Sequence, residues 1–223
     1  MASGLSARIV SIQVGLPSKH GEDVTDNAAG GAWFTGFYKK PVAGPVAVHP
    51  TNLAGDGQAD LRVHGGPDKA VLAYSFDHYS HWQAELALND FPTGAFGENL
   101  TLSGVHEANC CLGDIWRAGD CLLEVSQPRQ PCWKLARRWD IKDLPKRVIA
   151  TGRTGWYFRV VQVGTITAGD EFLLEQRPCP DWTIDRANRA MYDRATPREE
   201  TVALSEVAAL AEAWREPLVG RIR

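Results

Sequence analysis

The segment SQPRQPCWKL, residues 126–135, combines residue types that could carry chemistry. Cys132 follows Pro131, and proline favours the first position of a helix because its missing N–H would have no partner there. We therefore expect a helix to begin at Pro131, with Cys132 as its second residue. The positive end of this helix, together with the cations Arg129 and Lys134, would favour ionisation of the thiol. A thiolate so placed can act as a nucleophile or bind a soft metal.

An unreactive core residue is the alternative interpretation of Cys132, because free cysteines often serve as small buried hydrophobes. The chain holds five cysteines in all, an odd number that shows no disulfide framework. They contain no C-x-x-C pair, which argues against zinc and iron–sulfur sites. The other four, which lack the context of Cys132, are Cys110, Cys111, Cys121 and Cys179.

A glycine-containing loop, HGGPDK at residues 64–69, is a second candidate. Gly65 and Gly66, which follow His64, would let the backbone approach an anion closely, and Lys69 could supply a cation. The spacing is not that of a Walker phosphate loop, which needs Gly-Lys-Ser/Thr. A plain turn with a solvated lysine remains the alternative.

Two further polar residues lie in otherwise apolar surroundings. Asn99 follows a glycine and Glu98 at the start of an expected strand, where it either faces a pocket or caps a turn. Arg159 lies within the apolar run 156–163, either as an anion ligand or as a charge that protects a sheet edge.

Composition limits the classes of protein that fit. The net charge of −3 gives no general reason to expect binding to a nucleic acid polymer. No segment approaches the roughly 18 apolar residues that a membrane helix needs, and the first residues lack the apolar core of a signal peptide. We therefore expect a cytoplasmic protein that does not bind membranes.

The elements that must position these residues are mostly short strands. We expect strands at 7–14 and 41–50, a hairpin of 115–117 with 121–125, and a second pair of 156–163 with 171–174. Many short strands at this spacing favour a barrel or a sandwich. Helices are expected at 75–88 and 132–139.

The character of the chain changes after Gln176. A linker-like RPCP segment precedes helical patterns at 181–192, 201–204 and 207–214, with Ser205 as a cap between the last two. We expect two domains: a mainly β, barrel-like domain with short helices at 1–176, and a small three-helix domain at 177–223. Because three short helices are too small to be stable alone, they should pack on the barrel.

The ordered set of motifs resembles the MOSC family, named after the C-terminal domain of molybdenum cofactor sulfurase. Within that family, the chain is most similar to the bacterial subgroup that confers resistance to 6-N-hydroxylaminopurine. The motifs that carry the resemblance, in chain order, are GD at 55–56, QAD at 58–60, HGGPD at 64–68, FGENL at 96–100, SQPR at 126–129 with PC at 131–132, GW at 155–156 and RV at 159–160, followed by the helical tail from Pro180.

The resemblance implies a barrel-like fold and a pyranopterin molybdenum cofactor, with Cys132 as the protein ligand to molybdenum and the catalytic residue. It implies reduction of N-hydroxylated compounds to amines. Since the cofactor carries a phosphate and an anionic dithiolene, cations should converge on it. The residues expected to bind it by motif position and charge are His64, Lys69, Asn99, Arg129 and Arg159.

Partners and rival functions follow from the same resemblance. The sequence has no dinucleotide fingerprint and no cluster-binding cysteines, so a separate flavoprotein or ferredoxin-type reductase is expected to supply electrons. The sequence does not decide the oligomeric state, and a homodimer is one possibility because helical appendages often contribute to dimers. One rival is a cofactor carrier or sulfur-transfer protein without turnover. The other is a non-catalytic module that binds a different anion while Cys132 is inert.

Overall fold

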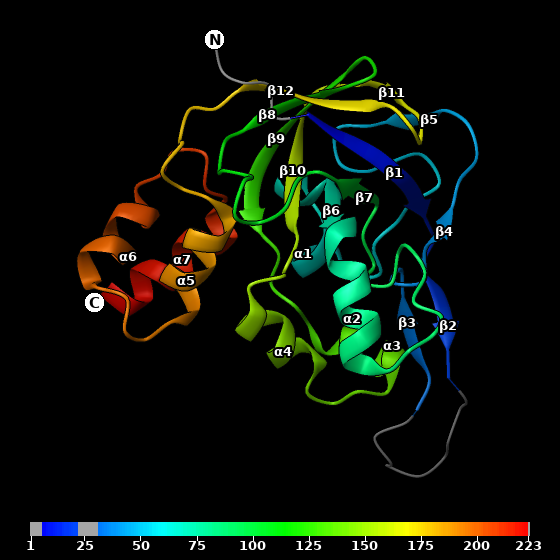
Figure 1. The fold of residues 1–223 in the computed structure, drawn as a ribbon, viewed down its shortest axis with the longest axis horizontal. Helices are drawn as coiled ribbons and strands as arrows, with labels where there is room; N and C mark the ends of the chain where they lie inside the picture. Colours follow the sequence, from blue (N-terminus) through cyan, green and yellow to red (C-terminus); the bar gives the residue numbers. More distant parts are fainter. Residues whose placement is uncertain (1–5, 22–30, 223) are drawn as a thin grey trace.

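The computed structural model describes residues 6–21 and 31–222, and within these residues seven strands close into a barrel (Figure 1). The strand order is β12-β8-β9-β10-β6-β7-β1, and β12 pairs with β1 to complete the ring. The barrel predicted from the sequence is therefore confirmed. The strands are β1 (Ser6–Val14), β6 (Val71–Ser75), β7 (Leu100–Ser103), β8 (Ile115–Ala118), β9 (Cys121–Pro128), β10 (Trp156–Gln162) and β12 (Glu171–Gln176).

Alternation of side chains explains why these segments form barrel strands. In the β8–β9 hairpin, Trp116 and Leu123 are fully buried cross-strand partners, and the turn uses Gly119 at a φ of +51°. This hairpin was predicted correctly. The parallel pairing of β6 with β7 is the exception among the antiparallel pairings that close the described barrel.

The predicted pairing of 156–163 with 171–174 is wrong, although both strands exist. β10 pairs with β9 and β6, whereas β12 pairs with β8 and β1, because barrel closure separates the two. The chain between them forms β11 (Gly164–Ile166), which pairs with β5 (Val46–Val48) outside the barrel. The strand expected at 41–50 is likewise divided, between β4 (Lys40–Pro41) and β5.

Short helices and one hairpin cover one end of the barrel. The covering elements are β2 (Ser18–His20), β3 (Trp33–Thr35), α1 (Leu61–His64), η1 (Pro67–Lys69), η2 (Phe76–His78), α2 (Tyr79–Leu86), α3 (Trp133–Trp139) and α4 (Leu144–Thr151). The helix expected at 75–88 starts later than predicted, because Ser75 ends β6 and the 3-10 turn η2 precedes α2.

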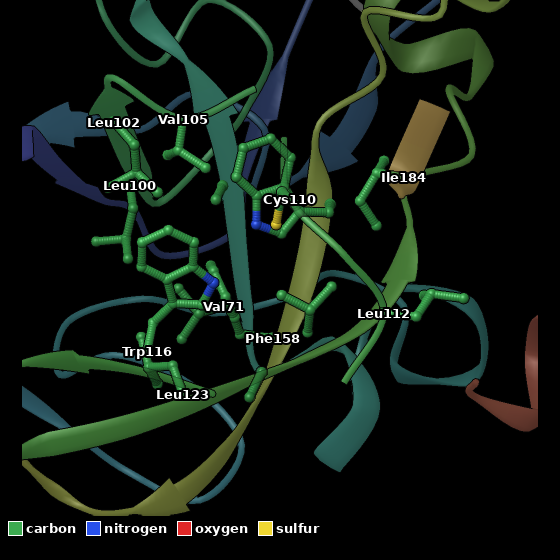
Figure 2. Close-up of a cluster of buried hydrophobic side chains, with 14 of the residues drawn as sticks. Val71, Leu100, Leu102, Val105, Cys110, Leu112, Trp116, Leu123, Phe158 and Ile184 are labelled. Carbon is green, nitrogen blue, oxygen red and sulfur yellow. The ribbon is translucent and has the colours of Figure 1, made fainter. Parts of the chain in front are cut away.

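Three C-terminal helices pack against the barrel (Figure 1): α5 (Ile184–Tyr192), α6 (Arg198–Ser205) and α7 (Glu212–Ile222). They share its buried core: Ile184 lies with Phe158 and Cys110 in one apolar cluster (Figure 2). The three-helix unit was predicted, but the predicted start of its third helix was wrong. Ser205 ends α6 instead of capping the next helix, which begins only at Glu212. None of the described helices has the length and apolar character that crossing a bilayer requires.

Candidate functional site

A pocket with about 600 Å³ of empty space, part of it open to solvent, lies at the end of the barrel that carries α1 and α3. It brings together five of the six residues predicted to form the site: Cys132, His64, Lys69, Asn99 and Arg129. The residues that line it are Thr35, Gly36, Phe37, Lys39, Gly57, Gln58, Ala59, His64, Lys69, Leu72, Phe96, Gly97, Asn99, Arg129, Gln130, Cys132, Lys134 and Tyr157.

Cys132 is the residue immediately before α3, not the second residue of that helix. Its backbone is extended, with φ of −109° and ψ of 169°, and its carbonyl oxygen accepts a hydrogen bond from Leu135 N at 3.1 Å. Pro131 therefore precedes the helix, which corrects the predicted start. The thiol is partly exposed at the pocket wall and makes no capping hydrogen bond.

The other four cysteines lie outside this pocket. Burial raises the pKa of the Cys111 and Cys121 thiols to about 11, and it also raises the pKa of Cys110 and Cys179. These groups therefore stay protonated near neutral pH. Within residues 6–21 and 31–222, no three His, Cys, Asp or Glu side chains cluster as metal ligands would. Among the described residues that line the pocket, Cys132 supplies the thiol and His64 the imidazole.

Arg129 has an unsatisfied buried nitrogen. The residue is 4% exposed, its backbone N–H donates to Gly155 O at 3.0 Å, and its Nη1 has no hydrogen-bond partner. Leaving a buried charged donor unpaired costs on the order of 1–3 kcal/mol or more. Since Arg129 lines the pocket, an anionic acceptor bound there could supply the missing partner.

His64 is uncharged at neutral pH. Burial, followed by the nearby cations Lys134, Lys69 and Arg129, lowers the pKa of its imidazole to about 4. A neutral imidazole offers one N–H donor and one acceptor to a ligand. The loop that follows His64 depends on Gly66, whose φ of +93° is a conformation that other residues rarely adopt.

One hydrogen bond holds the Lys69 ammonium group beside the residue that precedes the glycine-containing loop. Its Nζ donates to Val63 O at 2.9 Å, and burial lowers its pKa while Asp68 opposes that shift. Only part of its donor capacity is used by this bond, because an ammonium has three N–H groups. Lys69 can therefore donate to a ligand in the pocket.

Asn99 lines the pocket, but its side chain is occupied by internal hydrogen bonds. Its Oδ1 accepts from Leu72 N at 3.1 Å, and its Nδ2 donates to Gln13 O at 3.2 Å and to Asp56 Oδ2 at 2.9 Å. Both amide protons are used. The structure therefore places Asn99 as a residue that positions Asp56, with no donor left for a ligand.

A buried ion pair, Lys39 with Asp56, was missed by the sequence reasoning. The two side chains are 7% and 0% exposed, and Asp56 also accepts from Gly15 N at 3.0 Å. Burial lowers the pKa of Lys39, and Asp56 counteracts this effect. Lys39 lines the pocket, so it adds a fourth cation to Lys69, Arg129 and Lys134. The segment FYKKPV gave no signal that separates Lys39 from its exposed neighbour Lys40.

Arg159 does not reach the pocket. Its guanidinium pairs with Asp68, and its Nη1 lies 3.0 Å from Glu124 Oε1. Asp68 is also held through its backbone oxygen, which accepts from Ser126 Oγ at 2.6 Å. Arg159 is therefore placed to fix the backbone next to Lys69, which differs from the direct contact with a ligand that was expected.

The walls of the pocket suit an anion. No carboxylate is among the described residues that line it, whereas Phe37 and Phe96 supply apolar surface. Gly36 and Gly57 approach so closely that a Cβ on Gly36 would collide with the Gly57 carbonyl oxygen. Backbone therefore forms part of the wall, and four cationic residues line the same pocket.

Comparisons with known proteins agree with this architecture. The MOSC domain family matches residues 60–173, which is half of the chain, and the YiiM-like 3-alpha helix domain matches residues 182–223. The chain belongs to the MOSC domain family. MOSC domains are associated with molybdenum cofactor binding in general, and YiiM is the 6-N-hydroxylaminopurine resistance family that the motifs indicated.

Relatives cover most of the MOSC chain. The uncharacterized protein YflK of Bacillus subtilis is 42% identical over 81% of each chain. A protein named "Reductase" from Gibberella moniliformis is 40% identical over 77% of this chain, but the match spans 31% of that protein. The crystal structure of YiiM from Geobacillus stearothermophilus has a TM-score of 0.80 and 36% identity, and the match covers 97% of this chain and all of that one.

Proposed function

We propose that this MOSC protein is a molybdenum-cofactor-dependent reductase of N-hydroxylated compounds, such as 6-N-hydroxylaminopurine, with Cys132 as the protein ligand to molybdenum. The observation that carries this proposal is the pocket itself, in which a partly exposed thiol lies with the unsatisfied, buried Arg129 and three lysines, and the lining residues that the structure describes include no carboxylate. The family membership and the relative named "Reductase" support an enzymatic role.

The donor set fits a pyranopterin molybdenum cofactor. Arg129 Nη1 lacks an acceptor and would bind an anionic oxygen of the cofactor, and Lys69 and Lys134 would add charge to the same end of the pocket. His64 would offer a neutral donor, because its pKa of about 4 keeps it uncharged. Cys132 Sγ would bind the metal, since thiolate is a ligand that suits it.

The reaction consumes two electrons and two protons: RNHOH + 2e⁻ + 2H⁺ gives RNH₂ + H₂O. When bound, the cofactor supplies the redox chemistry of N–O cleavage. The chain's own residues orient the substrate and hold protons. Lys39 lines the pocket and its Nζ is held by Asp56, so Lys39 can donate a proton to the N-hydroxyl oxygen as it leaves as water.

Electrons must reach the pocket from another protein. The sequence has no dinucleotide fingerprint, and the described residues hold no cluster of metal-ligating side chains. We therefore infer a separate flavoprotein or ferredoxin-type donor. In the fungal "Reductase", more than two thirds of the protein lies outside the matched region, which leaves room for further domains in the same chain.

The first experiment is a measurement of molybdenum and of oxidised-pterin fluorescence in protein from a cofactor-producing host. The wild type and a Cys179→Ser control should carry nearly one molybdenum per chain, and Cys132→Ser should lose it. Cys179 is a fair control because it is partly exposed and lies outside the pocket. A wild type without molybdenum or pterin would contradict the proposal and favour a module that binds another anion.

Turnover then separates the reductase from a carrier. Loaded protein with reduced methyl viologen should convert 6-N-hydroxylaminopurine to the 6-amino compound, as measured by chromatography of the two purines. A protein that retains molybdenum but does not turn over this or any other N-hydroxylated substrate would be a cofactor carrier or sulfur-transfer protein instead.

A further inference from the structure

Large apolar side chains are exposed around the mouth of the pocket. Leu16 is 68% exposed and lies against the pocket-lining Gly57, where its Cδ2 would be 3.4 Å from a Cβ added to that glycine. Leu61 is 69% exposed and lies three residues before His64, on the same face of α1. Trp133 is 57% exposed between Cys132 and Lys134. Side chains of this size usually cluster at a surface only where something binds.

Helix α3 adds cations beside these apolar groups. Arg137 lies over the rings of Trp33 and Trp133, at 5.1 and 5.9 Å, and Arg138 lies 4.6 Å from the ring of Tyr38. Within the part of the chain that the structure describes, neither arginine is paired with a carboxylate. Stacking on aromatic rings orients the guanidinium groups while their charge stays available.

We propose that Leu16, Leu61, Trp133, Arg137 and Arg138, here called the mouth rim, dock an electron-transfer protein of flavodoxin type through an acidic face. The inference rests on the proposed function, because it assigns a partner to the same pocket. An apolar centre with a charged border is the usual composition of a small, transient protein interface. Opposite charges would steer the two proteins together and orient the donor toward the pocket.

The electron balance requires two donor encounters per substrate. Each flavodoxin hydroquinone loses one electron and becomes a semiquinone, so two of them reduce one RNHOH, and solvent supplies the two protons that yield RNH₂ and water. An electron donor that binds transiently suits these two successive transfers, because the first flavodoxin must leave before the second can dock.

A second copy of this chain fits the mouth rim less well. A two-fold interface brings the same patch of both copies together, so a dimer centred on Arg137 and Arg138 would place these arginines near their copies. Like charges at such a contact are unfavourable by several kcal/mol. An acidic partner removes this conflict.

The test compares two electron donors with the same molybdenum-loaded protein. Flavodoxin, kept reduced by NADPH and its reductase, must dock, whereas reduced methyl viologen is small enough to enter without docking. Leu61→Glu and Arg138→Glu add negative charge to the mouth rim without altering a lining residue. The matched control is Val163→Glu, since Val163 is 54% exposed and follows β10 at the end opposite the pocket-lining Tyr157.

Both rim variants should lower the flavodoxin-driven kcat/KM by about tenfold or more, while Val163→Glu stays near the wild type. Methyl viologen rates and molybdenum content should be unchanged in all three. Salt should slow the flavodoxin reaction alone, because it screens steering charges.

Three results would overturn the docking proposal while the proposed function stands: methyl viologen supports turnover and flavodoxin does not, the control loses as much as the rim variants, or the rim variants convert a dimer to a monomer. A loaded protein that reduces no substrate with either donor would instead remove the proposed function and this inference with it.

Discussion

The buried pair of Lys39 and Asp56 gives a prediction that can be worked through from the structure. Asp56→Asn keeps the shape of the side chain and can keep the bond from Gly15 N, but it removes the negative charge beside a lysine that is 7% exposed. Asn99 Nδ2 would then face an amide in place of a carboxylate oxygen. Lys39 must either remain charged without a counter-charge or release its proton.

Breaking one side of a buried ion pair costs about 3–5 kcal/mol. For a chain of this size, that corresponds to a fall of about 6–20 °C in the thermal midpoint. The cost should also depend on pH. Without Asp56, the pKa of Lys39 in the fold is lowered further, so the unfolded chain binds more protons than the folded chain, and stability rises with pH. The variant should therefore lose less stability at pH 9.5 than at pH 6.5.

Urea and thermal unfolding, followed by circular dichroism on protein made without cofactor, measure this directly because ligand loss then plays no part. Asp68→Asn is the control, since the Asp68 side chain is 40% exposed and its pair with Arg159 should matter by less than about 1 kcal/mol. The double variant Lys39→Met/Asp56→Asn should recover much of the loss. A cost for Asp56→Asn below about 1 kcal/mol, or one that grows with pH, would refute the reasoning.

Three further predictions concern other parts of the molecule. Because the pKa of His64 is about 4 in the fold and higher when unfolded, wild-type stability should fall as the pH drops from 6.5 toward 4; His64→Gln should show a smaller fall in urea midpoints, and an equal fall would contradict the assignment. Arg129→Met removes an unpaired buried nitrogen, so the cofactor-free thermal midpoint should not decrease although bound molybdenum is lost; normal molybdenum content would count against the role of Arg129. Trp214→Ala should cost about 3–5 kcal/mol in one cooperative transition, because this fully buried side chain belongs to the shared core; separate unfolding of helices and barrel would disprove that.

The sequence predicts the parts of the site that are local. Cys132, His64 and Lys69 were found because proline, glycine and charge mark their segments, and the structure brings them together. Lys39 could not be found in this way, because it meets Asp56 only through the fold, 17 residues away in sequence. Arg159 shows the converse: its charge within an apolar strand was visible, but its partners Asp68 and Glu124 lie on other elements.

The same division applies to the fold. Apolar alternation identified β1, and apolar runs between turn signals identified β8, β9 and β10, since these patterns lie within or beside each strand. The pairing of β12 with β1 depends on barrel closure, so sequence neighbours gave the wrong partner for β10. Helix α7 was misplaced because the segment after Ser205 contains apolar residues at helical spacing but forms a turn before Glu212.

The walls of the pocket come from segments as far apart as Thr35 and Tyr157, and the main apolar core lies elsewhere in the barrel. Such long-range closure is slow in folding, and a nascent chain that has not reached Tyr157 lacks part of the pocket wall. Under the proposed function, insertion of the cofactor would therefore be a late step of maturation that follows barrel assembly. Folded protein without cofactor could then still be filled, so the supply of cofactor would control the proposed activity without new synthesis of the chain.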